Sequence, residues 1–511
     1  MIYLKGVLFL IVVIAIFIAA FRSFNKEKLY NALILIVIGG FILRGWCIYH
    51  DGFLFAWDER YHALVAKNLA KNPFLPVLFE NPLLDYDYRQ WTMNHVWLHK
   101  QPLSLWLMAG SIKLLGASEW AIRLPSLLLS TMGIYLTFRI AAFFKDEKTG
   151  LLAAFFQAVN GLAIEIATGR QSTDHPDNVF FFFIELAVWC TIVFLKRQTV
   201  INLFTIGLCT GLAVLSKWLP ALIVLPIFVI LNFNKRITKR GSFQTIALLQ
   251  GSPYRVKQWL KIILNSFVIL FIAALVALPW QFYIFYHFPQ EAAWEYSSNM
   301  RHFTEVFEGH NGSFGWHLIK AMRIWNELIY LALGWFLYKT YKEPQNEKNW
   351  VLICWISVPY LLFSMAATKM IAYPLFTAPA IFTVLAMFWW HLYDKPLKIY
   401  GLNQLILTTI IVLAVRYGYE RMWLFKDTSF YETETQRIKS WNPDSKTVIF
   451  NLPERYIETM FYSSVGAAYP FLPDEQQIDS LKQKGYKVWI VRSPNLTPKL
   501  LSRRDVLFIE N

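Results

Sequence analysis

The chain has 511 residues, of which 56% are hydrophobic, 17% aromatic and only 16% charged. Its mean hydropathy of +0.38 excludes an ordinary soluble domain, in which about a quarter of the residues are charged. The formal net charge of +15 does not indicate nucleic acid as a partner, because most Lys and Arg stand in short loops between apolar runs, a pattern typical of membrane topology.

Apolar runs of about 17–25 residues are long enough to cross a hydrocarbon core about 30 Å thick, and they recur through the first four-fifths of the chain. The first run follows Lys5 and is expected to be a retained helix, because no small-residue cleavage site follows it. Four cysteines fall inside or beside apolar runs and are expected to be buried packing residues: Cys47, Cys190, Cys209 and Cys354. About twelve membrane helices are predicted, near 6–21, 31–49, 123–144, 150–166, 178–195, 201–216, 218–233, 262–286, 317–338, 349–366, 371–392 and 399–418.

Alternate loops carry the positive charge and are therefore predicted to be cytoplasmic. Their basic residues are Arg22, Lys26, Lys28, Lys145, Lys148, Lys196, Arg197, Lys235, Arg236, Lys239, Arg240, Lys339, Lys342, Lys348, Lys395 and Lys398. The two longest loops, 50–122 and 287–316, then face outward. Within the first of them, 102–116 is too short to span and is expected to lie along the interface.

The composition changes near residue 420. Short apolar runs at 446–450 (KTVIF) and 487–491 (KVWIV) are separated by polar stretches. The predicted fold is therefore a polytopic α-helical membrane domain, 1–419, followed by a small soluble α/β domain, 420–511, on the outer face.

The first outward loop carries a pair of carboxylates, Asp58 and Glu59, in FAWDERYHALVAKNLA. Acidic residues at a helix start also act as caps, so a capping role remains an alternative. In the functional interpretation, a carboxylate at the membrane surface accepts a proton from an attacking hydroxyl or amine.

Four basic residues lie at outward helix ends, where the positive-inside bias predicts few cations. They are Lys100, Arg170, Arg301 and Lys369. A lysine at such a place can also snorkel to the interface. As a set, the four residues favour an anionic ligand, and a lipid phosphate at the interface fits them.

A divalent metal ion is the one cofactor candidate, and no nucleotide or organic cofactor is expected. His99 and His310 are its candidate ligands, with His302, Glu59, Glu305, Glu308 and Asp174 as further donors. Their spacing matches no tight metal motif. Asp174 and Asp177 are expected to cap the helix near 178, with Pro176 in its first turn.

These segments resemble the GT-C glycosyltransferases of the protein O-mannosyltransferase and lipid A aminoarabinose transferase type. WDERYHALVAKNLA is similar to the family's Asp-Glu signature, and Asp58 falls on its catalytic aspartate. Further matching positions are Lys100, Pro102, Arg123, Leu124, Pro125 and Ser126, then Arg170, Pro176, Asp177, Lys217, His310, Lys369, Tyr373 and Pro379. His99 and Gln101 depart from the family pattern, in which an acid and a proline are common.

The resemblance implies transfer of a sugar from a polyprenyl-phosphate-sugar donor to a lipid, glycan or protein acceptor. The reaction would be a single displacement with inversion, and Asp58 would be the general base. It would take place at the periplasmic side of a bacterial inner (plasma) membrane. Three alternatives remain: a polyprenyl-linked glycan flippase or transporter, a GT-C oligosaccharide ligase or polymerase, and a non-catalytic scaffold.

Overall fold

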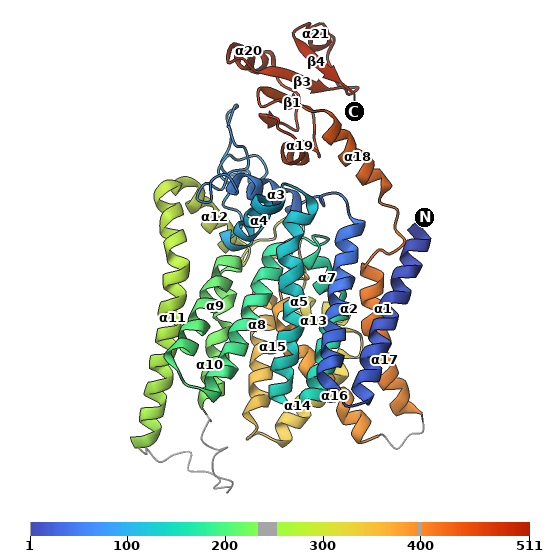
Figure 1. Cartoon of the computed structure of the whole chain (residues 1–511). Coiled ribbons are helices and arrows are strands. Elements are labelled where there is room, and N and C mark those ends of the chain that lie inside the picture. The colour runs from blue at the N-terminus through green and yellow to red at the C-terminus, as the bar shows by residue number, and fades with distance from the viewer. Residues whose placement is uncertain (1, 234–252, 397–400, 511) are drawn as a thin grey trace.

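The computed structural model describes residues 2–233, 253–396 and 401–510, and it is dominated by a helical bundle (Figure 1). Within these residues, nine helices are long and apolar enough to cross a membrane. They are α1 (Ile2–Asn25), α2 (Leu29–His50), α5 (Glu119–Phe144), α8 (Asp174–Lys196), α9 (Val200–Lys217), α11 (Pro253–His287), α15 (Glu347–Met365), α16 (Ala378–Asp394) with the preceding turn η3 (Leu375–Thr377), and α17 (Leu402–Arg421). The polytopic helical prediction is confirmed.

Three of the predicted spans are interrupted or short. The run 150–166 forms α6 (Glu147–Val159) and α7 (Gly161–Ala167), which bend by 55° and bring the possible spans to ten. The run 218–233 forms the 3-10 turn η1 (Leu219–Ile223) and α10 (Val224–Phe233). The run 317–338 is divided into α13 (Trp316–Trp325) and α14 (Ile329–Lys342).

The side chain of Asn160 explains how two of these breaks are tolerated inside the bundle. Its oxygen accepts the backbone N–H of Ala163 (2.9 Å) at the start of α7. Its amide donates to the carbonyl of Ile324 (2.7 Å) at the end of α13. Helix breaks at membrane depth require such partners, because no lipid group replaces the lost backbone hydrogen bonds.

Three shorter helices, α3 (Asp58–Leu69), α4 (Pro102–Leu115) and α12 (Pro289–Arg301), belong to the two long loops. All three lie at the same end of the bundle as the C-terminal part of the chain (Figure 1). Helix α4 is the short apolar helix that the sequence predicts at 102–116. The long loops and the C-terminal residues therefore share one face.

The C-terminal part contains the predicted α/β fold. Its elements are α18 (Ser429–Ser440), β1 (Thr447–Phe450), α19 (Tyr456–Tyr462), β2 (Ala467–Ala468), α20 (Glu475–Gln483), β3 (Lys487–Val491), α21 (Pro498–Leu501) and β4 (Val506–Ile509). The strands form a parallel sheet in the order β2-β1-β3-β4, with Val448 paired to Val488 and Val488 to Val506. Both predicted apolar runs, 446–450 and 487–491, are its central strands.

This sheet shares a hydrophobic core with the first long loop, 50–122. Buried residues of α3 and α4, such as Leu64 and Leu105, belong to one cluster with Ile449 and Ile490 of the sheet. Lys67 of α3 donates to the carbonyls of Met460, Phe461 and Ser463 at 2.8, 2.8 and 3.0 Å. The C-terminal part is thus packed directly on α3, and the domain boundary near 420 stays a prediction.

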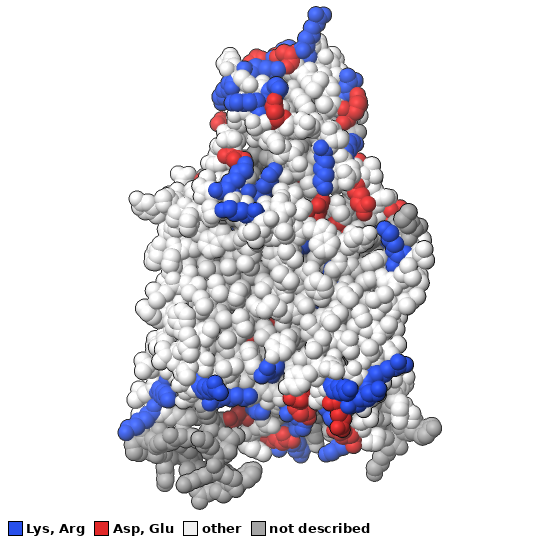
Figure 2. Space-filling model, in the orientation of Figure 1, with Lys and Arg blue, Asp and Glu red and all other residues white. Residues whose placement is uncertain are grey.

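The charged side chains gather at the two ends of the bundle (Figure 2). Between them lies a broad belt with few charges on the visible face, as expected for a surface in contact with hydrocarbon. Of the basic residues predicted to be cytoplasmic, Lys235, Arg236, Lys239, Arg240 and Lys398 lie outside the described residues.

Candidate active site

Asp58 is the first residue of α3 and lies almost buried at the end of the bundle that carries the long loops, with 8% of its surface exposed. Its Oδ2 accepts the backbone N–H of Thr173 at 2.6 Å. The ammonium of Lys100 lies 3.9 Å from the same oxygen. Thr173 and Lys100, which are far apart in the sequence, therefore meet at Asp58.

The charges around Asp58 keep its carboxylate ionised. Burial alone raises the pKa of Asp58, but the charges of Lys100, His62 and His99 and the N–H of Thr173 outweigh it and lower that pKa to about 2. An ionised carboxylate can accept a hydrogen bond from an incoming hydroxyl or amine. Its low basicity means that proton transfer must accompany bond formation rather than precede it.

A second carboxylate, Asp177, lies beside this site in the first turn of α8. It forms an ion pair with Lys217, the last residue of α9, and it accepts the hydroxyl of Thr173. The ammonium of Lys217 lies 4.9 Å from the ring centroid of Tyr373. Thr173 thus connects the Asp177–Lys217 pair to Asp58.

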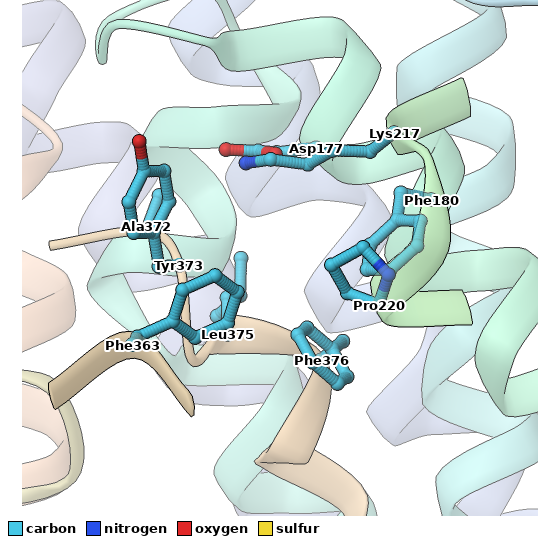
Figure 3. A pocket seen from close by; sticks show the side chains of 9 residues that line it. All are labelled: Asp177, Phe180, Lys217, Pro220, Phe363, Ala372, Tyr373, Leu375 and Phe376. Atoms are coloured by element: carbon cyan, nitrogen blue, oxygen red, sulfur yellow. The ribbon is translucent and has the colours of Figure 1, made fainter. Parts of the chain in front are cut away.

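Asp177, Lys217 and Tyr373 border a small pocket (Figure 3). The side chains of Asp177 and Lys217 extend toward Tyr373 along one side of the pocket, and apolar side chains line the other. The apolar side consists of Phe180, Pro220, Phe363, Leu375 and Phe376. The pocket thus has one charged side and one apolar side.

The backbone is strained at three places around these groups. Trp57 has φ 74°, Thr173 has φ 64° and Trp218 has φ 69°, a region that bulky and β-branched residues rarely occupy. Each of them directly precedes or follows a charged residue described here, namely Asp58, Asp174 or Lys217. Strain of this kind gathers at functional sites, which supports the choice of this region.

Glu59, the second predicted carboxylate, is enclosed by other groups. Its two oxygens accept from Nε and Nη2 of Arg123 at 2.7 and 2.8 Å, and Oε2 also accepts the N–H of Phe55 at 2.7 Å. Burial raises the pKa of Glu59, but Arg123 and His175 outweigh this and lower it to about 2. In this arrangement Glu59 has no open side for a substrate.

Two of the four predicted cations are similarly occupied. Arg170 binds both carboxylate oxygens of Asp51 at 2.7 and 3.1 Å and stacks over the ring of Trp423. Lys369 donates to the carbonyls of Phe363, Ser364 and Ala366 at the end of α15. These contacts explain how each charge is tolerated in a buried place.

Arg301 is the more accessible of the remaining pair of predicted cations. Its guanidinium lies 3.6 Å from Glu305 and 5.0 Å from the ring centroid of Trp294. It lies near His302, whose pKa burial lowers to about 4, helped by the charges of Lys100, His99 and Arg301. Arg301 and Lys100 thus both lower the pKa of His302.

The predicted metal ligands do not form a cluster. His99 Nδ1 lies 3.4 Å from Glu295, whereas the backbone carbonyl of His310 accepts the N–H of Lys369. Across the described part of the chain, no three His, Cys, Asp or Glu side chains are arranged to hold a metal ion. The structure thus supports no particular ligand set.

Two contacts of the candidate site were not predicted from the sequence, although Asp174 itself was predicted as a helix cap and as a possible metal ligand. Asp174 starts α8, but its Oδ1 lies 2.9 Å from Nδ1 of the buried His62, so its carboxylate is engaged in a contact beyond a helix cap. Thr173 is the residue that links Asp58 and Asp177. No sequence pattern marks either contact, because both depend on a turn of the backbone.

This helical architecture, with a small sheet at one end, is that of GT-C membrane proteins. Residues 99–254 match the family model described as dolichyl-phosphate-mannose-protein mannosyltransferase. The undecaprenyl phosphate-alpha-4-amino-4-deoxy-L-arabinose arabinosyl transferase of Pectobacterium carotovorum is 25% identical over 305 residues, 57% of this chain and 48% of that protein. The chain thus spans about half the length of such curated relatives.

Solved structures agree with this assignment. ArnT from Cupriavidus metallidurans bound to undecaprenyl phosphate is similar with a TM-score of 0.57, at 12% identity, over 93% of this chain and 89% of that one. An oligosaccharyltransferase of Archaeoglobus fulgidus in complex with Zn and sulfate has a TM-score of 0.51, at 13% identity, over 86% and 62%. The described part of the chain thus shares the GT-C fold of these membrane proteins.

Proposed function

We propose that this protein is a glycosyltransferase that moves a sugar from a polyprenyl-phosphate donor to an acceptor at the outer face of the membrane. The observation that carries the proposal is the ionised Asp58 beside Lys100, next to a pocket with one charged and one apolar side. A polyprenyl-phosphate-sugar has matching parts: an anionic phosphate, a sugar and a hydrocarbon chain. The names of the similar proteins point to the same donor class.

In the proposed reaction, Asp58 accepts the proton of the acceptor's hydroxyl or amine as that group attacks the anomeric carbon. The bond from this carbon to the phosphate oxygen breaks, and the polyprenyl phosphate leaves with the electron pair. One displacement inverts the configuration at the carbon. Lys100 and Arg301 would stabilise the negative charge that develops on the leaving phosphate.

Arg170 and Lys369 receive a different role in this proposal. Because their donors already bind Asp51 and the end of α15, we assign them to holding the outer ends of the helices. Glu59 likewise supports α3 through Arg123. A divalent metal near His99 remains part of the proposal only as an additional charge for the phosphate, and no step requires it.

The test is sugar transfer in proteoliposomes, with a panel of radiolabelled polyprenyl-phosphate sugars and membrane extract as acceptor. Wild type should transfer one of the labels. Asp58→Asn, which keeps the shape of the side chain and removes its basicity, should be slower by about 10²- to 10⁴-fold. Transport of labelled lipid without transfer would favour the flippase alternative, and equal transfer by both proteins would remove Asp58 as base.

The proposed placement is a bacterial inner membrane with the site on the periplasmic side. It is checked with a cysteine at the exposed position Ser502 in the C-terminal part. A membrane-impermeant maleimide should label Ser502→Cys in spheroplasts without lysis. Labelling only after lysis would reverse the orientation.

A further inference from the structure

Thr173 connects two carboxylates that come from distant parts of the chain. Its N–H donates to Asp58, 115 residues earlier, at 2.6 Å. Its hydroxyl donates to Oδ2 of Asp177, whose other oxygen binds Lys217. Thr173 is itself nearly buried, with 8% of its surface exposed. One residue therefore contacts both Asp58 and the Asp177–Lys217 ion pair.

The conformation of Thr173 permits both contacts at once. Its φ of 64° lies in the left-handed region, which is unfavourable for a β-branched residue. Thr173 also occupies the N-cap position of α8, where a threonine hydroxyl ordinarily accepts a backbone N–H of the first turn. Here no such cap bond forms, because the hydroxyl is directed to Asp177 instead.

We infer that Thr173 is a positioning residue that holds Asp58 in register with the Asp177–Lys217 pair. The inference rests on the proposed transferase function, since it concerns the base of that reaction. Asp58 comes from α3, whereas Asp177 and Lys217 come from α8 and α9. The hydroxyl of Thr173 fixes the turn before α8 against Asp177, and the N–H of the same residue then orients Asp58 toward the acceptor.

The consequence concerns catalysis more than donor binding. Without the hydroxyl, the turn before α8 loses its fixed link to Asp177, and the N–H of Thr173 no longer orients Asp58 in one direction. A displacement of about 1 Å at a reacting group costs up to about 10²-fold in rate. Lys100 and the apolar side of the pocket are unaffected, so the KM for the donor should change little.

Three variants and a matched control test the inference in the proteoliposome assay. Thr173→Ala removes the hydroxyl and should lower kcat by about 10- to 100-fold, with the donor KM within about twofold of wild type. Thr173→Ser keeps the hydroxyl and should restore kcat to within about threefold. The control is Thr168→Ala, which also removes a buried threonine hydroxyl. That hydroxyl donates to the backbone carbonyl of Ile164, and the variant should keep the kcat of wild type.

A glycine variant separates positioning from stability. Thr173→Gly removes the hydroxyl together with the Cβ that disfavours a positive φ. It should melt no lower than Thr173→Ala and be equally slow. A purely structural threonine would instead give activities that follow the melting temperatures.

Two results would overturn the inference while leaving the proposed function intact. One is a kcat of Thr173→Ala equal to that of Thr173→Ser, in a preparation where wild type is active and Asp58→Asn is not. The other is an equal loss in Thr168→Ala. If wild type transfers no sugar at all, the proposed function fails and the inference falls with it.

Discussion

Arg123 and Glu59 form a two-pronged ion pair, with N–O distances of 2.7 and 2.8 Å, in which both side chains are fully buried. Arg123 also donates to the carbonyls of Asp51 and Phe53, both at 2.6 Å. It therefore ties the start of α5 to the segment between α2 and α3. The orientation of the first turn of α3, and so of Asp58, depends on this pair.

Glu59→Gln is expected to destabilise the protein, since it leaves the guanidinium of Arg123 buried without its counter-charge. Breaking a buried ion pair from one side costs about 3–5 kcal/mol. The melting temperature of the detergent-purified protein should fall clearly, and kcat per folded molecule should fall far less than in Asp58→Asn. A variant with normal melting and no activity would return Glu59 to a catalytic role.

Lys100 and Lys369 were both predicted to bind phosphate, but substitutions of the two residues should have different effects. Lys100→Met removes an accessible charge next to Asp58 and should raise the donor KM or lower kcat, with little loss of stability. Lys369→Met removes three hydrogen bonds to carbonyls at the end of α15 and should lower the melting temperature by leaving those groups unpaired. Measured together, donor KM and melting temperature decide between the two roles, and an opposite pattern would exchange them.

In the wild type, Asp58 should stay ionised between about pH 4 and 8, so protonation of Asp58 should not reduce the activity in this range. The pKa of this carboxylate is depressed from its ordinary value to about 2. Its contribution to stability is thus present above the ordinary pKa and is lost as the pH falls through about 2. In Lys100→Met, the pKa of Asp58 should rise, and the acid limb of the kcat/KM profile should move to higher pH.

His302 is the control for this profile, because a group with a pKa of about 4 can also produce an acid limb. An acid limb that disappears in His302→Gln belongs to that ring. A limb that stays in His302→Gln and does not move in Lys100→Met would contradict the electrostatic account of Asp58.

Lys67 should matter for the attachment of the C-terminal part to α3. Its ammonium binds three carbonyls at the end of α19, and burial lowers the pKa of Lys67 to about 8. Lys67→Met should leave these carbonyls without a donor and make the C-terminal residues more susceptible to limited proteolysis. The exposed Lys71→Met, one turn later and paired only with Glu80, is the matched control and should show no change.

Much of the architecture could be predicted from the sequence, because a membrane span needs about twenty apolar residues in a row and each such run is visible. The helix breaks at Asn160 and Asn326 could not be predicted, because the residues around them are as apolar as those of an unbroken span. Asp58 and Lys100 could both be proposed as site residues because they lie in the same long polar loop, 50–122, between two membrane helices. The contacts that occupy Glu59, Arg170 and Lys369 could not be predicted, because their partners lie far along the chain or on the backbone. Arg123 offered one signal, as a lone cation at the start of an apolar helix.

The hydrophobic core shared by the first outward loop and the C-terminal sheet has a consequence for how the protein is made. Residues 54–122 are translated more than 300 residues before their apolar partners in residues 447–509. At 5–20 residues per second the interval is on the order of half a minute. During that time α3 lacks its support, so Asp58 is held in its working position only after the sheet has been translated.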